Sequence, residues 1–302
     1  MRKFPKAMNE IRKLRAYARL PDSLERAYPE LAANQPKDIG RTRNRLSTIK
    51  AVLGGRRFGR VADLGGHSGY FCLSLIEAGI IDSAVVYDSS SDAILAGRLM
   101  AKEMGVSRRI EFVEHAIDMS FLKTLPHFDA IFCLNLLHHA GISFDVEPVR
   151  RCGWGRYAEN WLSEIRRKSE CAVISLGFQA GRPVNWGAPK AYRPAEFMRL
   201  VERAGWSVMY DANVWDVDRF GIKSAEGRFT RGATRHRPRP DYRKLLRKLL
   251  IRISSFTRIP LPLPPREKAQ DYFIYILTGA NQDVQLDTGV LYPLVLNASI
   301  FE

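Results

Sequence analysis

Acidic, glycine and histidine residues follow three apolar runs of this 302-residue chain. The first group is Asp63 with the glycines after it, the second is Asp88, and the third begins at Asn135. Carboxylates accept hydrogen bonds from hydroxyl groups, glycines allow tight turns, and a histidine can move a proton near neutral pH. These residue types predict a binding site for a nucleotide-like ligand beside a group that can act in catalysis.

The first group predicts a strand, a tight turn and a helix. Residues 61–64 form a short apolar run around Asp63, small residues follow, and apolar residues at helical spacing begin at Phe71. The glycines are Gly65, Gly66 and Gly69. They let a backbone approach a ligand closely, and the turn leads into the positive end of a helix. The dinucleotide fingerprint is not met and no Gly-Lys-Ser/Thr follows, which disfavours both NAD and a P-loop.

Asp88 ends the next predicted strand, residues 84–87. Neighbouring strands lie about 5 Å apart, so an acid at this tip can accept hydrogen bonds from both hydroxyls of a ribose held by the glycine turn. The alternative is an ordinary acid in front of the helix that begins near residues 89–92.

The third group follows a nearly continuous apolar strand, residues 128–135, of the kind that is covered on both faces. Asn135, His138 and His139 should lie near the reacting atoms, because ligands bind beyond the carboxyl ends of parallel strands. Successive helical residues point about 100° apart, so only one histidine can face the site. That histidine is a candidate general base, and a structural imidazole bonded to the backbone is the alternative.

Further strands are expected at residues 110–113, 171–176, after Gly205, and at 272–278, with helices between the earlier ones. With its expected strands and helices in this order, the chain resembles the class I S-adenosylmethionine (SAM) dependent methyltransferases over roughly residues 55–280. Their first motif is D/E-x-G-x-G-x-G, which Asp63, Gly65 and Gly69 match and His67 does not. The resemblance implies a doubly wound α/β fold with a seven-stranded, mostly parallel sheet whose last strand is antiparallel.

The resemblance also implies a cofactor, SAM, and residues that hold it. Asp88, with Ser89 beside it, matches the position of the ribose-binding acid. Asp118 lies where the family places an acid that accepts from the adenine amino group, and Ile117 is available to pack on the ring. For Asp118, a helix N-cap role is the alternative, and Glu114 is the alternative acid.

Length and composition allow one large domain or two small ones with a hydrophobic core, since 46% of the residues are hydrophobic. We expect an N-terminal helical segment (1–54), a methyltransferase domain (55–280) and a C-terminal tail (281–302). The four cysteines have no C-x-x-C spacing, so no metal site is expected, and three of them lie in or beside apolar runs, which predicts buried thiols in a reducing compartment. No apolar run reaches the 18 residues that a membrane span needs, so a cytoplasmic location is expected.

The net charge of +15 is unevenly spread. Residues 1–60 carry +11 and residues 219–268 carry +12, which leaves −8 for the rest. The second basic segment belongs to an insertion, residues 216–270, between the sixth and seventh predicted strands. Within it, residues 241–256 predict a helix with an apolar arc and a basic face. Such a helix packs on the body of the protein, or contacts a membrane surface or RNA phosphates.

The sequence therefore predicts a SAM-dependent methyltransferase with an anionic partner. Its expected acceptor is an oxygen or nitrogen of a small, lipid-linked or glycan-linked molecule, with peripheral membrane contact through residues 241–256 as an option. RNA, such as tRNA, is the second choice. A non-catalytic subunit with a SAM-binding fold is the third, because of His67 in the glycine turn.

Overall fold

The computed structural model describes residues 19–32, 39–179, 194–213 and 270–279. These residues form seven strands in one sheet, ordered β3-β2-β1-β4-β5-β7-β6. The strands are β1 (Phe58–Leu64), β2 (Ile81–Asp88), β3 (Ile110–Glu114), β4 (Ala130–Leu134), β5 (Cys171–Gln179), β6 (Trp206–Asn213) and β7 (Gln270–Gly279). Only β7 is antiparallel to its neighbours, so the predicted fold class is confirmed.

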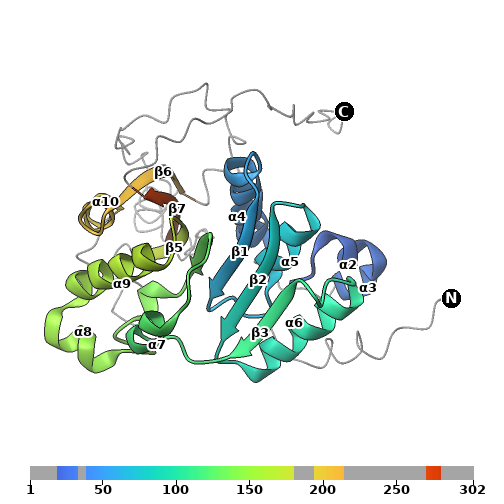
Figure 1. The fold of residues 1–302 in the computed structure, drawn as a ribbon, viewed down its shortest axis with the longest axis horizontal. Helices are drawn as coiled ribbons and strands as arrows, with labels where there is room; N and C mark the ends of the chain where they lie inside the picture. The colour runs from blue at the N-terminus through green and yellow to red at the C-terminus, as the bar shows by residue number, and fades with distance from the viewer. Residues whose placement is uncertain (1–18, 33–38, 180–193, 214–269, 280–302) are drawn as a thin grey trace, which may run out of the picture.

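Helices cover both faces of this sheet (Figure 1). One face carries α4 (Ile39–Leu53), α5 (Tyr70–Glu77) and α6 (Ser91–Glu103), while α2 (Asp22–Ala27) and α3 (Pro29–Ala32) extend that layer. The other carries α7 (Met119–Thr124), α9 (Trp154–Lys168) and α10 (Pro194–Arg203). Each layer buries its own hydrophobic cluster against the sheet, which explains the continuous apolar strands.

Several helix ends are set by glycine and serine residues with known local preferences. Gly79, Gly105 and Gly205 follow α5, α6 and α10 with φ of 70°, 70° and 81°, the left-handed region that glycine enters without steric cost. Ser90 caps α6 by accepting from Ala93 N–H at 3.3 Å. The sequence indicated α7 only through the alternative N-cap role of Asp118. It did not predict α8 (Val146–Cys152), which contributes no buried residue and so has no apolar periodicity to find.

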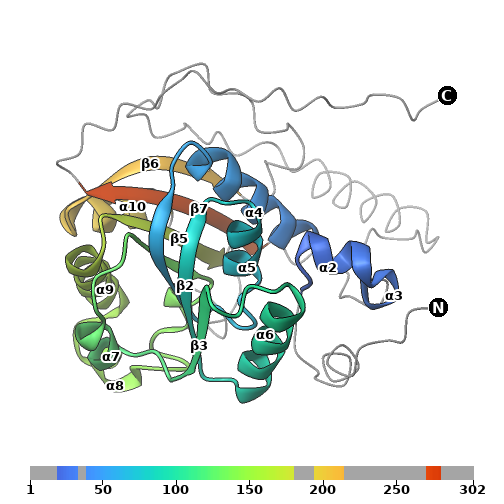
Figure 2. The ribbon, with the colours of Figure 1, turned by 45° about the vertical axis from the view of Figure 1, so that its right-hand side comes forward.

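The insertion separates β6 from β7 in sequence, but β7 pairs with β5 along one edge and with β6 along the other. Figure 2 shows β7 lying between these two strands. This is the arrangement expected for an antiparallel last strand. The predicted helix 241–256 and the tail 281–302 lie outside the described residues, as do residues 1–18 of the predicted N-terminal helical segment.

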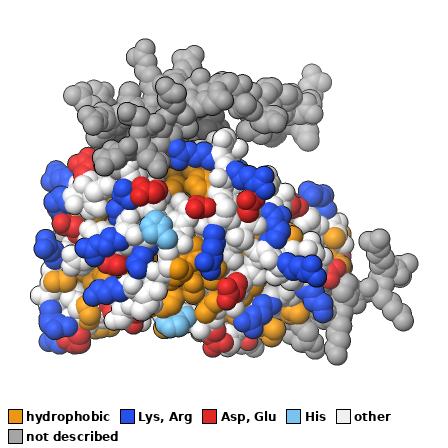
Figure 3. Space-filling model, in the orientation of Figure 1, with side chains coloured by type: hydrophobic (Ala, Val, Ile, Leu, Met, Phe, Trp, Pro, Cys, Tyr) orange, Lys and Arg blue, Asp and Glu red, His pale blue; other side chains and the backbone are white. Residues whose placement is uncertain are grey.

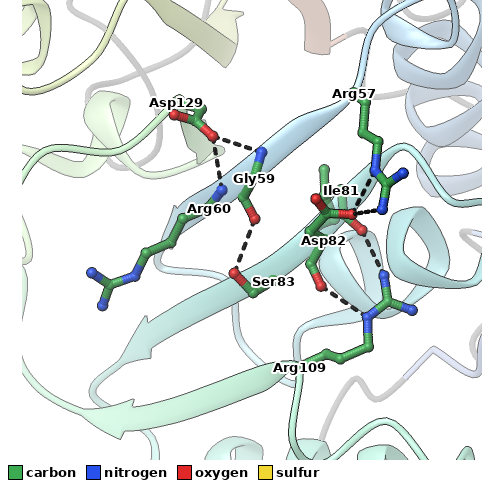
Figure 4. A network of polar contacts seen from close by, with 8 residues as sticks. All are labelled: Arg57, Gly59, Arg60, Ile81, Asp82, Ser83, Arg109 and Asp129. Carbon is green, nitrogen blue, oxygen red and sulfur yellow. Dashed lines mark hydrogen bonds and ion pairs between the residues drawn. The ribbon is translucent and has the colours of Figure 1, made fainter.

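A polar network closes the amino-terminal edge of the sheet, on the side away from the predicted site (Figure 4). Asp129, just before β4, accepts from the backbone N–H groups of Gly59 and Arg60 at 2.6 and 2.9 Å. Asp82 pairs with Arg57 at 2.7 Å, and Arg109 donates to the carbonyls of Ile81 and Asp82. These contacts fix the starts of the central strands relative to one another.

The surface seen in Figure 3 shows positive and negative side chains interleaved around a small apolar area. On this face the described residues form no continuous basic area. No helix in the described part of the chain is long and apolar enough to cross a bilayer.

Candidate functional site

The turn between β1 and α5 has a regular backbone pattern. Gly65, His67 and Gly69 take φ values of 69°, 52° and 71°, so alternate residues are left-handed. A left-handed conformation is unfavourable for most side chains, which is why a glycine is the usual residue at such positions. His67 nevertheless adopts the conformation that the middle glycine of the motif would supply. The departure from the motif therefore places a side chain on a left-handed residue of the turn.

The glycines of this turn make room for the protein's own atoms. A Cβ on Gly66 would lie 2.5 Å from the carboxyl carbon of Asp63, and a Cβ on Gly69 would lie 2.8 Å from the Phe112 ring. The sequence analysis expected these glycines to let the backbone approach a ligand, but the atoms nearest to them belong to the protein itself. At these two positions glycine is required first because the turn packs tightly on β1, β2 and β3.

Asp63 lies directly under the turn and is 1% exposed. Its Oδ2 lies 3.7 Å from the Cys72 thiol, while Oδ1 has no hydrogen-bond partner among the described residues. Burial raises the pKa of this carboxyl to about 7, because a carboxylate loses its hydration there, and the nearby Asp88 carboxylate adds to the effect. Asp63 is therefore a buried acid with one free oxygen below the predicted cofactor site.

Asp88 ends β2 beside this turn, as predicted. Its Oδ2 accepts from the His67 backbone N–H and its Oδ1 from the Ser90 N–H, both at 2.9 Å. Leu64 of β1 pairs with Tyr87 of β2, which places Asp88 one residue beyond the shared edge. The carboxylate is partly exposed and held in place by two backbone donors. Ser89 is exposed at the same tip.

The structure gives Asp118 the N-cap role that was the alternative. Its Oδ1 accepts from Phe121 N–H at 2.7 Å at the start of α7. Only one carboxylate oxygen is used in this bond, so the second remains to accept from a ligand. Ile117 is buried beside it at 7% exposure, and Phe121 stacks on His115 with ring centroids 4.1 Å apart.

Asn135 lies just beyond β4 with a left-handed φ of 64°. A guanidinium can only donate, so the Asn135 amide is assigned with its oxygen toward Arg45 of α4, where it accepts from Nη1 at 2.7 Å and Nη2 at 3.2 Å. Its amide nitrogen then donates to Ser175 Oγ at 3.2 Å. Sequence reasoning missed both partners. Arg45 is one of many basic residues in the N-terminal segment, and Ser175 interrupts an apolar strand without any motif.

The two histidines have different environments. His138 is 4% exposed, and its Nδ1 accepts from Gly177 N–H at 3.5 Å. Burial lowers the pKa of His138 to about 3, with His139 and Arg45 contributing. His139 is only half-buried, and desolvation lowers its pKa less strongly. The two rings are in contact, with centroids 4.2 Å apart.

No protein-family model and no curated protein sequence matches this chain. Solved structures do match it. A SAM-dependent methyltransferase from Geobacter sulfurreducens in complex with S-adenosyl-L-homocysteine is 13% identical, with 92% of this chain and all of that chain covered and a TM-score of 0.47. The crystal structure of WbdD is 20% identical over 70% of this chain, with a TM-score of 0.48. This chain spans only 44% of the WbdD chain.

The sheet order with its antiparallel β7 decides the fold. The chain has the class I methyltransferase fold.

The site is divided among five elements of this fold. The turn after β1, the tip of β2 and the segment after β4 meet at the carboxyl edge, while Asp118 follows β3 and Arg45 comes from α4. Residues 180–193, which follow β5 at the same edge of the sheet, lie outside the described residues. Among the residues described, no three metal-ligating side chains form a cluster.

Proposed function

We propose that the protein is a SAM-dependent methyltransferase. The observation that carries the proposal is the bond from the His67 N–H to Asp88, which joins a turn of alternating left-handed residues to an acid at the tip of the adjacent strand. The free backbone N–H groups at the start of the following helix favour an anionic group, and SAM carries a carboxylate at its amino-acid end. The retained turn also weakens the case for a non-catalytic subunit, which rested on His67.

The residues present fit SAM. Asp88 is the candidate for the ribose hydroxyls, the second oxygen of Asp118 for the adenine amino group, and Ile117 for the ring face. Asp63 has a buried oxygen, Oδ1, without a hydrogen-bond partner among the described residues. When bound, SAM supplies an electrophilic methyl group. The protein's task is then to hold the acceptor atom in line with that group, and alignment of this kind contributes several kcal/mol, roughly 7 to 11 in the best cases.

For the acceptor, we propose an oxygen or nitrogen of a small, lipid-linked or glycan-linked molecule. An acceptor that carries a proton needs a base, and an effective base has a pKa near the working pH. With a pKa of about 3, His138 is poorly suited, so His139 is the better candidate. An acceptor oxygen or nitrogen that reaches the site already deprotonated needs neither histidine as a base.

Calorimetry with SAM, S-adenosylhomocysteine and NAD tests the cofactor assignment. We expect the first two to bind and NAD not to bind. A screen with methyl-labelled SAM against small metabolites, lipid-linked glycans and total RNA then tests turnover. Tighter binding of NAD than of SAM would refute the assignment, and cofactor binding without transfer to any acceptor class would favour the non-catalytic alternative.

The insertion provides a separate test of the acceptor class. Membrane attachment through residues 241–256 requires the apolar arc, so Leu249→Asp with Leu250→Asp should abolish co-sedimentation with anionic liposomes. Binding of tRNA through the basic face should instead fall steeply with salt, with a log-log slope of about −0.7 per phosphate contact, and should survive the leucine changes. Salt-sensitive tRNA binding of that kind would make RNA the preferred acceptor.

A further inference from the structure

Asp145 stands at the start of α8, but its carboxylate serves another helix. The residue is half-buried and has a left-handed φ of 48°. An aspartate at this place normally accepts from N–H groups of its own helix, yet among the described residues of α8 its side chain has no such partner. Its Oδ2 accepts instead from the backbone N–H of Met119, the first residue of α7, at 2.8 Å. A left-handed residue that is not glycine is unfavourable, so the contact that it makes possible requires an explanation.

Tyr157 of α9 binds the same carboxylate oxygen. Its hydroxyl donates to Asp145 Oδ2, the residue is 2% exposed, and its ring packs on Trp161 with centroids 5.8 Å apart. Burial raises the pKa of Tyr157 far above its usual range, and the bond to Asp145 adds to the effect. The hydroxyl therefore stays protonated and is a fixed donor to Asp145.

The chain that follows the two histidines determines the position of Asp145. The carbonyl of His139 accepts from the Ile142 N–H at 3.0 Å, and the Gly141 N–H donates to the carbonyl of Phe144 at 2.8 Å. This closed turn leads directly into Asp145. Because α7, α8 and α9 lie together beside the sheet (Figure 1), one side chain joins all three helices to the segment after β4.

The start of α7 carries the residues that we assign to the adenine. Met119 directly follows Ile117 and Asp118. Its N–H is held by Asp145, which restricts how the first turn of α7 can rotate. The Asp118 carboxylate also raises the pKa of Tyr157, so it lies close to the same group of side chains. The direction of the second Asp118 oxygen therefore depends on Asp145.

We propose that Asp145, held by Tyr157, is a positioning residue that sets how strongly the site selects an adenine base. It acts through α7 by fixing Asp118, and it does not touch the cofactor. The inference rests on the proposed function and adds a residue that determines specificity. It also gives the exposed α8 segment a role, because this segment brings Asp145 to the start of α7.

The test compares two ligands that differ only in the adenine amino group. One is S-adenosylhomocysteine, and the other is its purine analogue, in which hydrogen replaces that group. In calorimetry the wild type should bind the first about 10- to 100-fold more tightly, the ratio that corresponds to a hydrogen bond to a charged group. Asp145→Gly keeps the left-handed backbone and removes the carboxylate, so this ratio should fall to about 3-fold or less. The affinity for the purine analogue should change by less than about 3-fold.

Three further variants separate the carboxylate from its surroundings. Asp145→Asn keeps an oxygen that accepts hydrogen bonds and tolerates the left-handed backbone, so it should retain most of the ratio. Tyr157→Phe keeps the ring but removes the donor, and it should lower the ratio in the same direction as Asp145→Gly. Glu147→Gln is the control, since it changes an exposed acid of α8 that pairs with Arg150, and it should leave the ratio unchanged.

A double-mutant cycle tests whether Asp145 acts through Asp118. Asp118→Ser retains an N-cap but removes the charged acceptor, so both ligands should bind this variant about equally. Adding Asp145→Gly should then leave the ratio as it is, because residues that act through one contact are not additive. A change of the ratio in that background would mean that Asp145 meets the base directly, and the positioning role would be wrong.

The remaining outcomes separate this inference from the proposed function. If the wild type binds neither ligand, the proposed function itself fails. Equal binding of both ligands by the wild type would overturn the inference and leave the proposed function intact. If Asp145→Gly weakens both ligands equally, or leaves the ratio unchanged in a folded protein, Asp145 only supports the fold. Should Asp145→Gly not fold, Tyr157→Phe gives the same comparison.

Discussion

The backbone N–H of His67 donates to Asp88 Oδ2 at 2.9 Å, and Asp88 Oδ1 accepts from Ser90. The acid that is expected to hold the ribose is therefore oriented before any ligand binds. Preorganisation of this kind reduces the entropy that binding must overcome.

The first prediction concerns the conformation of His67. His67 has a left-handed backbone conformation with φ of 52°, which glycine adopts without steric cost. His67→Gly should therefore leave the affinity for S-adenosylhomocysteine within about 3-fold of wild type. His67→Val places a β-branched residue there and should destabilise the fold by about 1 to 2 kcal/mol. Urea denaturation and calorimetry measure both effects. If glycine and valine had equal effects, the backbone conformation would not be what selects the residue.

The second prediction concerns Asp88. Asp88→Ala should weaken SAM binding by about 1.5 to 3 kcal/mol, the scale of hydrogen bonds to a charged group. Asp92→Ala, in the first turn of the following helix, is the matched control and should bind normally. Unchanged affinity in a folded Asp88→Ala protein would remove this residue from the cofactor site.

The third prediction follows from the buried acid under the turn. The pKa of Asp63 is raised to about 7, so between about pH 4 and pH 7 the folded protein keeps a proton that the unfolded chain releases. The free energy of unfolding should therefore fall as pH rises through this window. Asp63→Asn removes that dependence and, by pH 8, should be more stable than wild type by an amount on the order of 4 kcal/mol.

Urea denaturation of the ligand-free protein at several pH values between 5 and 8 gives the comparison, with Asp92→Asn as the control for a lost surface carboxylate. Parallel pH dependences for wild type and Asp63→Asn would show that Asp63 is not protonated in the folded state.

The fourth prediction separates the two histidines. His138 should remain neutral over the whole pH range from 5 to 9, because burial lowers its pKa to about 3, so it should add no inflection to the pH profile of kcat/KM. His138→Ala should instead lower stability by about 1 to 3 kcal/mol, since it empties a buried site next to Gly177.

If the acceptor needs a base, His139→Ala should lower turnover about 10² to 10⁴-fold with SAM affinity nearly unchanged. Equal and mild losses of turnover for the two variants would indicate that both histidines only position other groups. A large loss of turnover in a His138→Ala protein of wild-type stability would contradict the choice of His139 as the candidate base.

The sequence predicted the strands well because parallel strands covered on both faces are continuous apolar runs, as in residues 128–135. It also placed Asp88 and Asn135 at the carboxyl edge, since strand ends follow directly from those runs. It did not predict the Arg45–Asn135 contact. That contact joins residues 90 positions apart through tertiary packing, which has no local pattern. The capping role of Asp118 could be stated only as an alternative, because N-caps and ligand acceptors use the same residue types.

The position of β7 has a consequence for how the chain is made. β5 and β6 do not pair with each other, and the strand that joins them begins only at Gln270, after residues 214–269 have been synthesised. Until then the nascent chain exposes an unpaired β5 edge, and β6 has no neighbour in the sheet. β5 and β6 can therefore join in one sheet only once β7 is available to pair with both, which makes this edge of the sheet depend on long-range contacts, and such contacts form slowly.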